Sequence, residues 1–150
     1  MTSSKFMQEA ILQAKLAFEL DEVPVGAVIV LDNKVIAKSH NQNRTKKSAT
    51  AHAEMLAINQ ACSKLSTYRL DECDLYVTLE PCLMCATAIS IAKISRVYYG
   101  LADNKFGAYE NSDGIFTKYP SYFKPEIYSN ICESEVLKIM QEFFSSKRSS

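Results

Sequence analysis

The change from strand to helix that decides the fold lies in Leu75-Tyr76-Val77-Thr78-Leu79-Glu80-Pro81-Cys82-Leu83-Met84-Cys85. Residues 75–79 carry the β-branched and aromatic side chains that favour a strand. Pro81 suits the first turn of a helix, and residues 82–94 can continue that helix. Residues 96–99 then predict a second strand. A strand, a helix and a strand in this order indicate parallel strands joined by a right-handed crossover.

The sequence before this segment predicts a helix, a hairpin and a second helix. Residues 3–20 place apolar side chains at steps of three and four, which is typical of an amphipathic helix. Two short runs rich in small and β-branched residues, 25–30 and 35–37, flank the turn residues 32–34 and predict an antiparallel hairpin. Residues 51–63 are rich in Ala, Met and Leu and favour a helix.

The sequence after this segment predicts a long loop and a final helix. Residues 103–121 contain glycines and a proline and are expected to form a loop, and loops of this length usually have a function or are disordered. Residues 134–144 predict the last helix, and residues 145–150 are expected to be a frayed tail. The elements together predict a three-layer α/β/α domain around a central mixed sheet, with the helices at 51–63 and 82–94 on one face.

The composition favours one soluble domain that spans residues 1–150. The chain has 150 residues, of which 47% are hydrophobic, enough for one sizeable core. No run approaches the roughly 18 apolar residues of a membrane-spanning helix, and the N-terminus lacks the pattern of a signal peptide. We therefore expect a cytoplasmic protein with no membrane partner. The formal net charge is zero, so the composition itself gives no sign of nucleic-acid binding.

Two short segments carry residues that can hold a metal ion. Cys82 and Cys85 are three positions apart, which places both thiols on one face of a helix whose N-terminus favours thiolates. His52 would supply a third ligand, and three protein ligands with one open position are typical of catalytic zinc, which activates a water. Glu54 is predicted to accept the proton of that water and pass it on, not to bind the metal.

Each of these segments alone has ordinary explanations. A Cys-x-x-Cys pair can be a redox site or a structural zinc site, and a carboxylate at the start of a helix can be a surface charge. The combination of His-x-Glu with Pro-Cys-x-x-Cys matches the general description of zinc nucleobase deaminases. The joint pattern therefore favours a deaminase.

Beyond this pattern, residues 6–144 resemble the bacterial tRNA-specific adenosine deaminases of the cytidine and deoxycytidylate deaminase superfamily. The resemblance implies a cytidine-deaminase-like fold and the conversion of adenosine to inosine at the wobble position of a tRNA anticodon stem-loop. It also implies a homodimer with one Zn²⁺ per subunit. The segments that carry it are Glu22-Val23-Pro24-Val25-Gly26-Ala27-Val28, Thr50-Ala51-His52-Ala53-Glu54, Tyr76 to Cys85, and Glu142-Phe143-Phe144.

The resemblance also assigns a role to Asn41. An asparagine upstream of the metal histidine contacts the base in this family, and the amide of Asn41 can both donate to and accept from a purine edge. Residues 105–112 depart from the more Gly- and Ala-rich loop of the family, which concerns the contact with RNA and not the chemistry. Two other functions stay open: deamination of a free base or nucleoside such as cytosine or guanine, and a non-catalytic zinc-containing RNA-binding protein.

Overall fold

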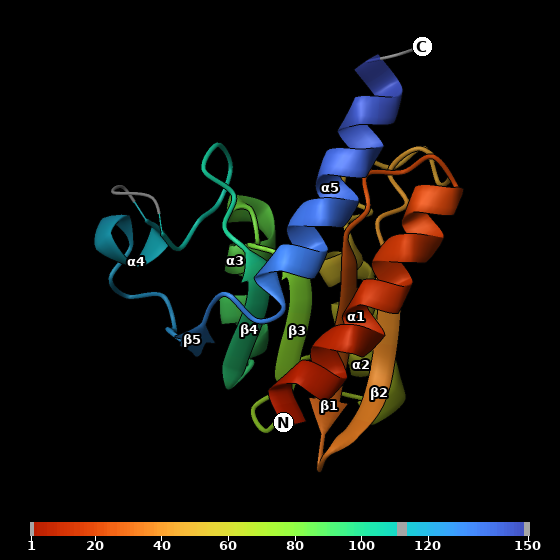
Figure 1. Cartoon of the computed structure of the whole chain (residues 1–150). Helices are drawn as coiled ribbons and strands as arrows, with labels where there is room; N and C mark the ends of the chain where they lie inside the picture. The colour runs from red at the N-terminus through yellow and green to blue at the C-terminus, as the bar shows by residue number, and fades with distance from the viewer. Residues whose placement is uncertain (1, 111–113, 149–150) are drawn as a thin grey trace.

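The computed structural model describes residues 2–110 and 114–148 (Figure 1). No helix in these two ranges combines the length and the apolar character needed to cross a membrane. In chain order the elements are α1 (Thr2–Glu19), β1 (Gly26–Leu31), β2 (Lys34–His40), α2 (Ala53–Leu65), β3 (Asp74–Leu79), α3 (Leu83–Ala92), β4 (Arg96–Leu101), α4 (Ile115–Lys118), β5 (Glu126–Tyr128) and α5 (Glu133–Arg148).

The sheet has the order β2-β1-β3-β4-β5. Strand β1 pairs antiparallel with both β2 and β3, whereas β3, β4 and β5 are parallel. The hairpin between β1 and β2 turns at Asp32 and Asn33, which both have positive φ, 51° and 63°. A two-residue turn with this backbone matches the twist of the strands. The predicted mixed sheet is confirmed, with an antiparallel hairpin followed by a parallel crossover.

Helices cover both faces of the sheet and form three layers. Helices α1 and α5 lie on one face, and α2 and α3 lie on the other (Figure 1). Helix α1 approaches β1 so closely that a Cβ at Gly26 would lie 2.0 Å from the carbonyl oxygen of Ala10. On the opposite face, α2 contributes the buried small residues Ala53, Ala57 and Ala61 to the larger core cluster. The α/β/α class predicted from the sequence is confirmed.

Three features of the C-terminal part differ from expectation. The expected loop at 103–121 contains the short helix α4, and its residues 111–113 lie outside the described part of the chain. Strand β5 was not predicted, because three residues are too few to show a period. The expected frayed tail at 145–150 is wrong for 145–148, where α5 continues to Arg148, and residues 149–150 lie outside the described part.

The last turn of α5 is fixed by contacts with α1 and with its own preceding turn. The Lys147 ammonium pairs with Asp21, just after α1, and lies 5.5 Å from the ring centroid of Phe143. The Ser146 hydroxyl donates a hydrogen bond to the carbonyl of Phe143. The ion pair joins residues more than a hundred positions apart, so the local pattern did not predict it.

A buried carboxylate, Glu22, connects the end of α1 to the loop that follows β2. It accepts hydrogen bonds from the Arg44 amide (3.1 Å), the Thr45 amide (2.6 Å) and the Thr45 hydroxyl (2.7 Å). Burial by itself raises the pKa of Glu22, but the hydrogen bonds from Thr45 and Arg44 outweigh it, so this pKa lies below its ordinary value of 4.5. The ionised form of Glu22 therefore stabilises the fold.

This stabilisation has a defined dependence on pH. Because the pKa of Glu22 is lower in the folded than in the unfolded chain, its contribution is present above about pH 4.5 and is lost as the pH falls through the folded value. We expect Glu22→Gln to lower the free energy of unfolding most at pH 7 and less towards pH 4, measured by urea denaturation. The exposed Glu19→Gln is the matched control. A difference between wild type and Glu22→Gln that grows on acidification would contradict the assignment.

Candidate metal centre and active site

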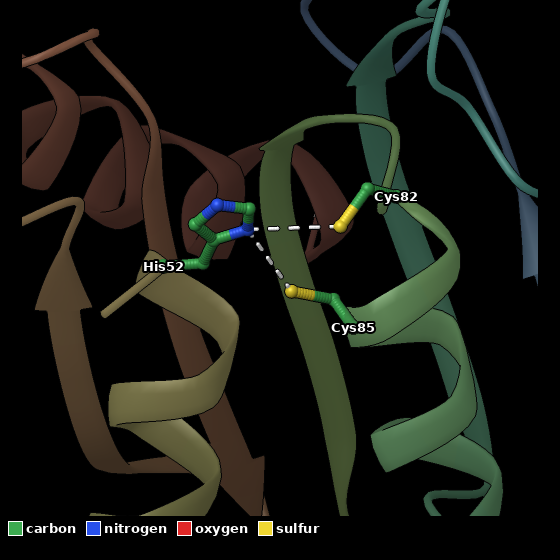
Figure 2. Close-up of side chains that lie close together, drawn as sticks. All are labelled: His52, Cys82 and Cys85. Atoms are coloured by element: carbon green, nitrogen blue, oxygen red, sulfur yellow. Dashed lines mark hydrogen bonds between the residues drawn. The ribbon is translucent and has the colours of Figure 1, made fainter. Parts of the chain in front are cut away.

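The starts of α2 and α3 bring together three side chains that could hold a metal ion. His52 occupies the N-cap position of α2, Cys82 occupies that of α3, and Cys85 lies in the first turn of α3. The His52 Nδ1 atom is 3.6 Å from the Cys82 Sγ and 3.5 Å from the Cys85 Sγ (Figure 2). The three ligand atoms all lie within 4.8 Å of one another. All three side chains point into the space between the two helices (Figure 2).

This donor set has the dimensions of a tetrahedral zinc site. With Zn–S bonds of about 2.3 Å and Zn–N bonds of about 2.0–2.1 Å, tetrahedral N and S ligands lie about 3.6 Å apart. The observed separations of 3.6 and 3.5 Å agree with that value. One imidazole and two thiols leave a fourth position free, so the residues fit a zinc ion with an open site.

The protonation of the two cysteines differs because they interact. A hydrogen bond from Cys85, then one from His52, lowers the pKa of Cys82 to about 4 against the opposing effect of burial. The interaction with Cys82, together with burial, raises the pKa of Cys85 well above its ordinary range. The hydrogen bond to Cys82 also raises the pKa of His52. These opposite shifts favour the thiolate at Cys82 and the thiol at Cys85, so a metal that binds both sulfurs must displace protons.

Glu54 is the second residue of α2 and is buried, with 4% of its surface exposed. Burial, and to a lesser extent the charge of Cys82, raise its pKa to about 7 against the opposing effects of a backbone hydrogen bond, His52 and Cys85. A carboxyl group with a pKa near neutrality can both accept and donate a proton under ordinary conditions. Glu54 thus has the protonation behaviour of an acid–base group beside the three candidate metal ligands.

A cavity of about 520 Å³ opens above these residues. His52, Glu54 and Cys82 form part of its lining, whereas Cys85 lies beneath with no exposed surface. Residues of the turn before β1 and of the loop after β2 also line the cavity, and so does Phe106. A cavity of this volume is large enough for a nucleobase.

Asn41 lies in the wall of this cavity and is 6% exposed. Its Nδ2 donates to the carbonyl of Val23 (3.3 Å), and its Oδ1 accepts from the amide of Asn43 (3.2 Å). One amide proton and one lone pair remain for a ligand. The structure thus brings Asn41 into the same cavity as His52 and Glu54, in a side-chain position fixed by the loop.

Glu80 is a buried carboxylate of this region that the sequence analysis did not single out. Its Oε1 accepts from the amide of Asp103 (2.9 Å), and its Oε2 accepts from the amides of Tyr109 (2.9 Å) and Glu110 (2.8 Å). A Cβ at Gly107 would lie 2.3 Å from its Oε1. Glu80 therefore fixes the 103–110 loop beside Cys82. No periodic pattern marks a carboxylate whose partners are backbone amides 23 to 30 residues away.

We expect Glu80→Gln to lower the free energy of unfolding by about 1–3 kcal/mol, measured by urea denaturation. The amide group of Gln turns an NH₂ towards backbone N–H donors, so buried donors lose their acceptor. The exposed Glu72→Gln serves as the control for loss of a carboxylate, and equal stability of the two variants would contradict this role for Glu80.

The amino-acid sequence of the chain is similar to those of known deaminases. The MafB19-like deaminase family matches residues 1–148 of the chain. The tRNA-specific adenosine deaminase of Agrobacterium fabrum is 50% identical over 143 residues, which cover 95% of this chain and 94% of that protein.

Two solved structures extend the comparison. One comes from a study of A-to-I editing by tRNA:A34 deaminases at the wobble position of transfer RNA. It is 50% identical, has a TM-score of 0.87, and the match covers 90% of this chain and 98% of that one. A guanine deaminase from Bacillus subtilis is 36% identical with a TM-score of 0.64, and the match covers 81% of this chain and 76% of that one.

Proposed function

Because this chain belongs to the family of the tRNA-specific adenosine deaminases, we propose that it hydrolyses adenosine to inosine at the wobble position of a tRNA anticodon. The observation that carries the proposal is the cavity that holds Glu54 beside the three donors of His52, Cys82 and Cys85. Hydrolytic deamination needs a group that transfers protons and a site that can hold zinc, and here a carboxyl group lies next to a zinc-type donor set.

In this proposal His52, Cys82 and Cys85 hold one zinc ion per subunit. A bound zinc ion would supply Lewis acidity and lower the pKa of a water molecule at its open position. Zinc requires both cysteines as thiolates and His52 as a neutral imidazole. The N-termini of α2 and α3 assist, because their unpaired amides and dipoles favour negative charge on the sulfurs.

Glu54 moves the protons of the reaction. It takes a proton from the attacking water and delivers it to the ring nitrogen of the base. It then transfers the second proton of that water to the departing amine, which leaves as ammonia. Adenosine and water are consumed, and inosine and ammonia are produced. Because Glu54 is buried in the cavity wall, bulk water competes little for its proton.

Asn41 orients the base. The amide proton and lone pair that its loop contacts leave free can bind a donor–acceptor pair on a purine edge. Its fixed position means that little side-chain freedom is lost on binding.

We further propose that the enzyme is a cytoplasmic homodimer that acts on the anticodon stem-loop of tRNA. Two large exposed apolar side chains of α3, Leu83 (53% exposed, at the edge of the cavity) and Ile91 (62% exposed), offer a surface for a second copy. Light scattering on the purified protein tests this, and a monomer at micromolar concentration would contradict it.

The substrate assignment is tested with defined compounds. Purified protein is incubated with an anticodon stem-loop carrying a wobble adenosine and, separately, with free cytosine, guanine and adenosine. We expect inosine in the RNA and little turnover of the free compounds. Turnover of guanine with unchanged RNA would instead indicate a free-base deaminase, the activity of the Bacillus subtilis relative. Binding of RNA without any turnover would indicate a non-catalytic zinc protein.

A further inference from the structure

Phe106 is a large apolar side chain at the mouth of the cavity that has no part in the core. It lines the cavity together with Asn41 and Glu54, yet 63% of its surface is exposed. Exposure of an aromatic ring beside a functional cavity costs solvation free energy, and no core packing of this ring offsets that cost. The ring is therefore available to a ligand that occupies the cavity.

The backbone around Phe106 is held rigidly. The amide of Phe106 donates to the Asp103 Oδ1 (3.0 Å), and the amide of Gly107 donates to the Asp103 carbonyl (2.9 Å). Gly107 also forms a β-bridge with Cys82, and Glu80 accepts three amides of the same loop. The base of the ring is thus fixed relative to the metal centre, so its position is pre-organised for binding.

A positive charge lies next to the ring. The Nζ of Lys105 is 5.3 Å from the centroid of the Phe106 ring. An exposed aromatic ring with an adjacent cation is the combination that single-stranded nucleic acids recognise, because the base stacks on the ring and the cation attracts the phosphate. A free nucleobase that fits the cavity would need neither group outside it.

We propose that Phe106 binds the RNA by stacking on the nucleobase next to the target nucleotide. This inference rests on the proposed function, because it requires a polynucleotide substrate. When the target base leaves the stack and enters the cavity, the adjacent nucleobase loses its stacking contact with it. Stacking on Phe106 replaces that contact. Phe106 is then a specificity residue that separates an RNA substrate from a free nucleoside.

The test compares Phe106→Ala with Phe106→Trp, which keeps a stacking surface. The control is Tyr68→Ala, which removes a similarly exposed aromatic ring (69%) between α2 and β3. We expect Phe106→Ala to lower kcat/KM for the stem-loop about 10- to 100-fold, chiefly through KM, and Phe106→Trp to restore it. Zinc content and the midpoint of thermal unfolding should stay unchanged, since the side chain is exposed.

A spectroscopic measurement separates stacking from a structural effect. Stem-loops carry 2-aminopurine either immediately 5′ or immediately 3′ of the target, and its fluorescence is quenched when it stacks on a ring. We expect quenching at one of these positions with wild type, Phe106→Trp and Tyr68→Ala, and not with Phe106→Ala. Equal kcat/KM and equal quenching for wild type and Phe106→Ala would overturn the proposal.

Two further outcomes are distinguishable. A change of oligomeric state in Phe106→Ala, with quenching retained, would place the ring at a subunit contact and overturn the stacking role. If wild-type protein quenches 2-aminopurine through Phe106 but forms no inosine, the stacking role stands and the proposed function fails.

Discussion

We expect the replacement of Glu54 with Gln to lower the rate of deamination by about 100- to 10,000-fold while the protein retains about one zinc per chain. Gln keeps the shape of the side chain but cannot accept the proton of the attacking water. The change leaves the three candidate metal donors untouched, because Glu54 does not belong to the cluster of His52, Cys82 and Cys85. Single-turnover rates on the stem-loop and metal analysis of the same preparation measure both quantities.

The matched control for this change is Glu19→Gln, an exposed carboxylate at the end of α1. It should react at the wild-type rate. Retained activity in Glu54→Gln would show that the proton is moved by another group. Loss of zinc together with activity would show that Glu54 binds the metal, which is the role we argue against.

We expect the replacement of Cys85 with Ser, or removal of the metal with a chelator, to abolish deamination and lower the midpoint of thermal unfolding. The donors of His52, Cys82 and Cys85 come from two helices, so a shared ion joins α2 to α3 and its binding free energy adds to that of folding. Returning zinc to the chelated wild type should restore activity. Metal analysis, activity and thermal unfolding are measured on each sample.

The control is Cys62→Ser. Cys62 is a partly buried cysteine of α2 that does not belong to the cluster of His52, Cys82 and Cys85. It should keep its zinc and its activity. Full activity in the chelated protein, with metal analysis confirming that zinc is gone, would exclude a zinc-dependent mechanism. Equal loss of zinc in Cys62→Ser and Cys85→Ser would mean that the metal is bound elsewhere.

Most of the fold could be predicted because its elements carry strong local patterns. The β-branched runs of β1 and β3 and the apolar spacing of α1 each indicate one structure, and their order in the chain sets the parallel crossover. Strand β5 could not be predicted, because its three residues follow Pro125 and are held by pairing with β4. The last turn of α5 depends on Asp21, which only the folded chain brings near.

The candidate metal donors were visible in the sequence because Cys82 and Cys85 are close along the chain and His-x-Glu is a compact pattern. The sequence indicated helices that include His52 and Cys82, whereas both residues are N-caps with extended backbone. This small shift points both side chains towards the space between α2 and α3 (Figure 2).

Residues that act through the loop at 103–110 could not be found in the same way. Glu80 binds backbone amides, which every residue type offers, so no partner pattern exists in the sequence. Phe106 reads as an ordinary apolar residue until the fold shows that it lies at a cavity mouth with 63% of its surface exposed. Exposure and long-range hydrogen bonds are properties of the folded chain.

The most direct test of RNA-directed hydrolysis is a reaction of the wild-type protein with a wobble-adenosine stem-loop in water enriched in heavy oxygen. Digestion of the RNA and mass spectrometry then locate the label. We predict inosine at the wobble position only, with the heavy oxygen at C6 and an equal amount of ammonia released. An unchanged wobble adenosine, or inosine that lacks the label, would contradict the proposed function.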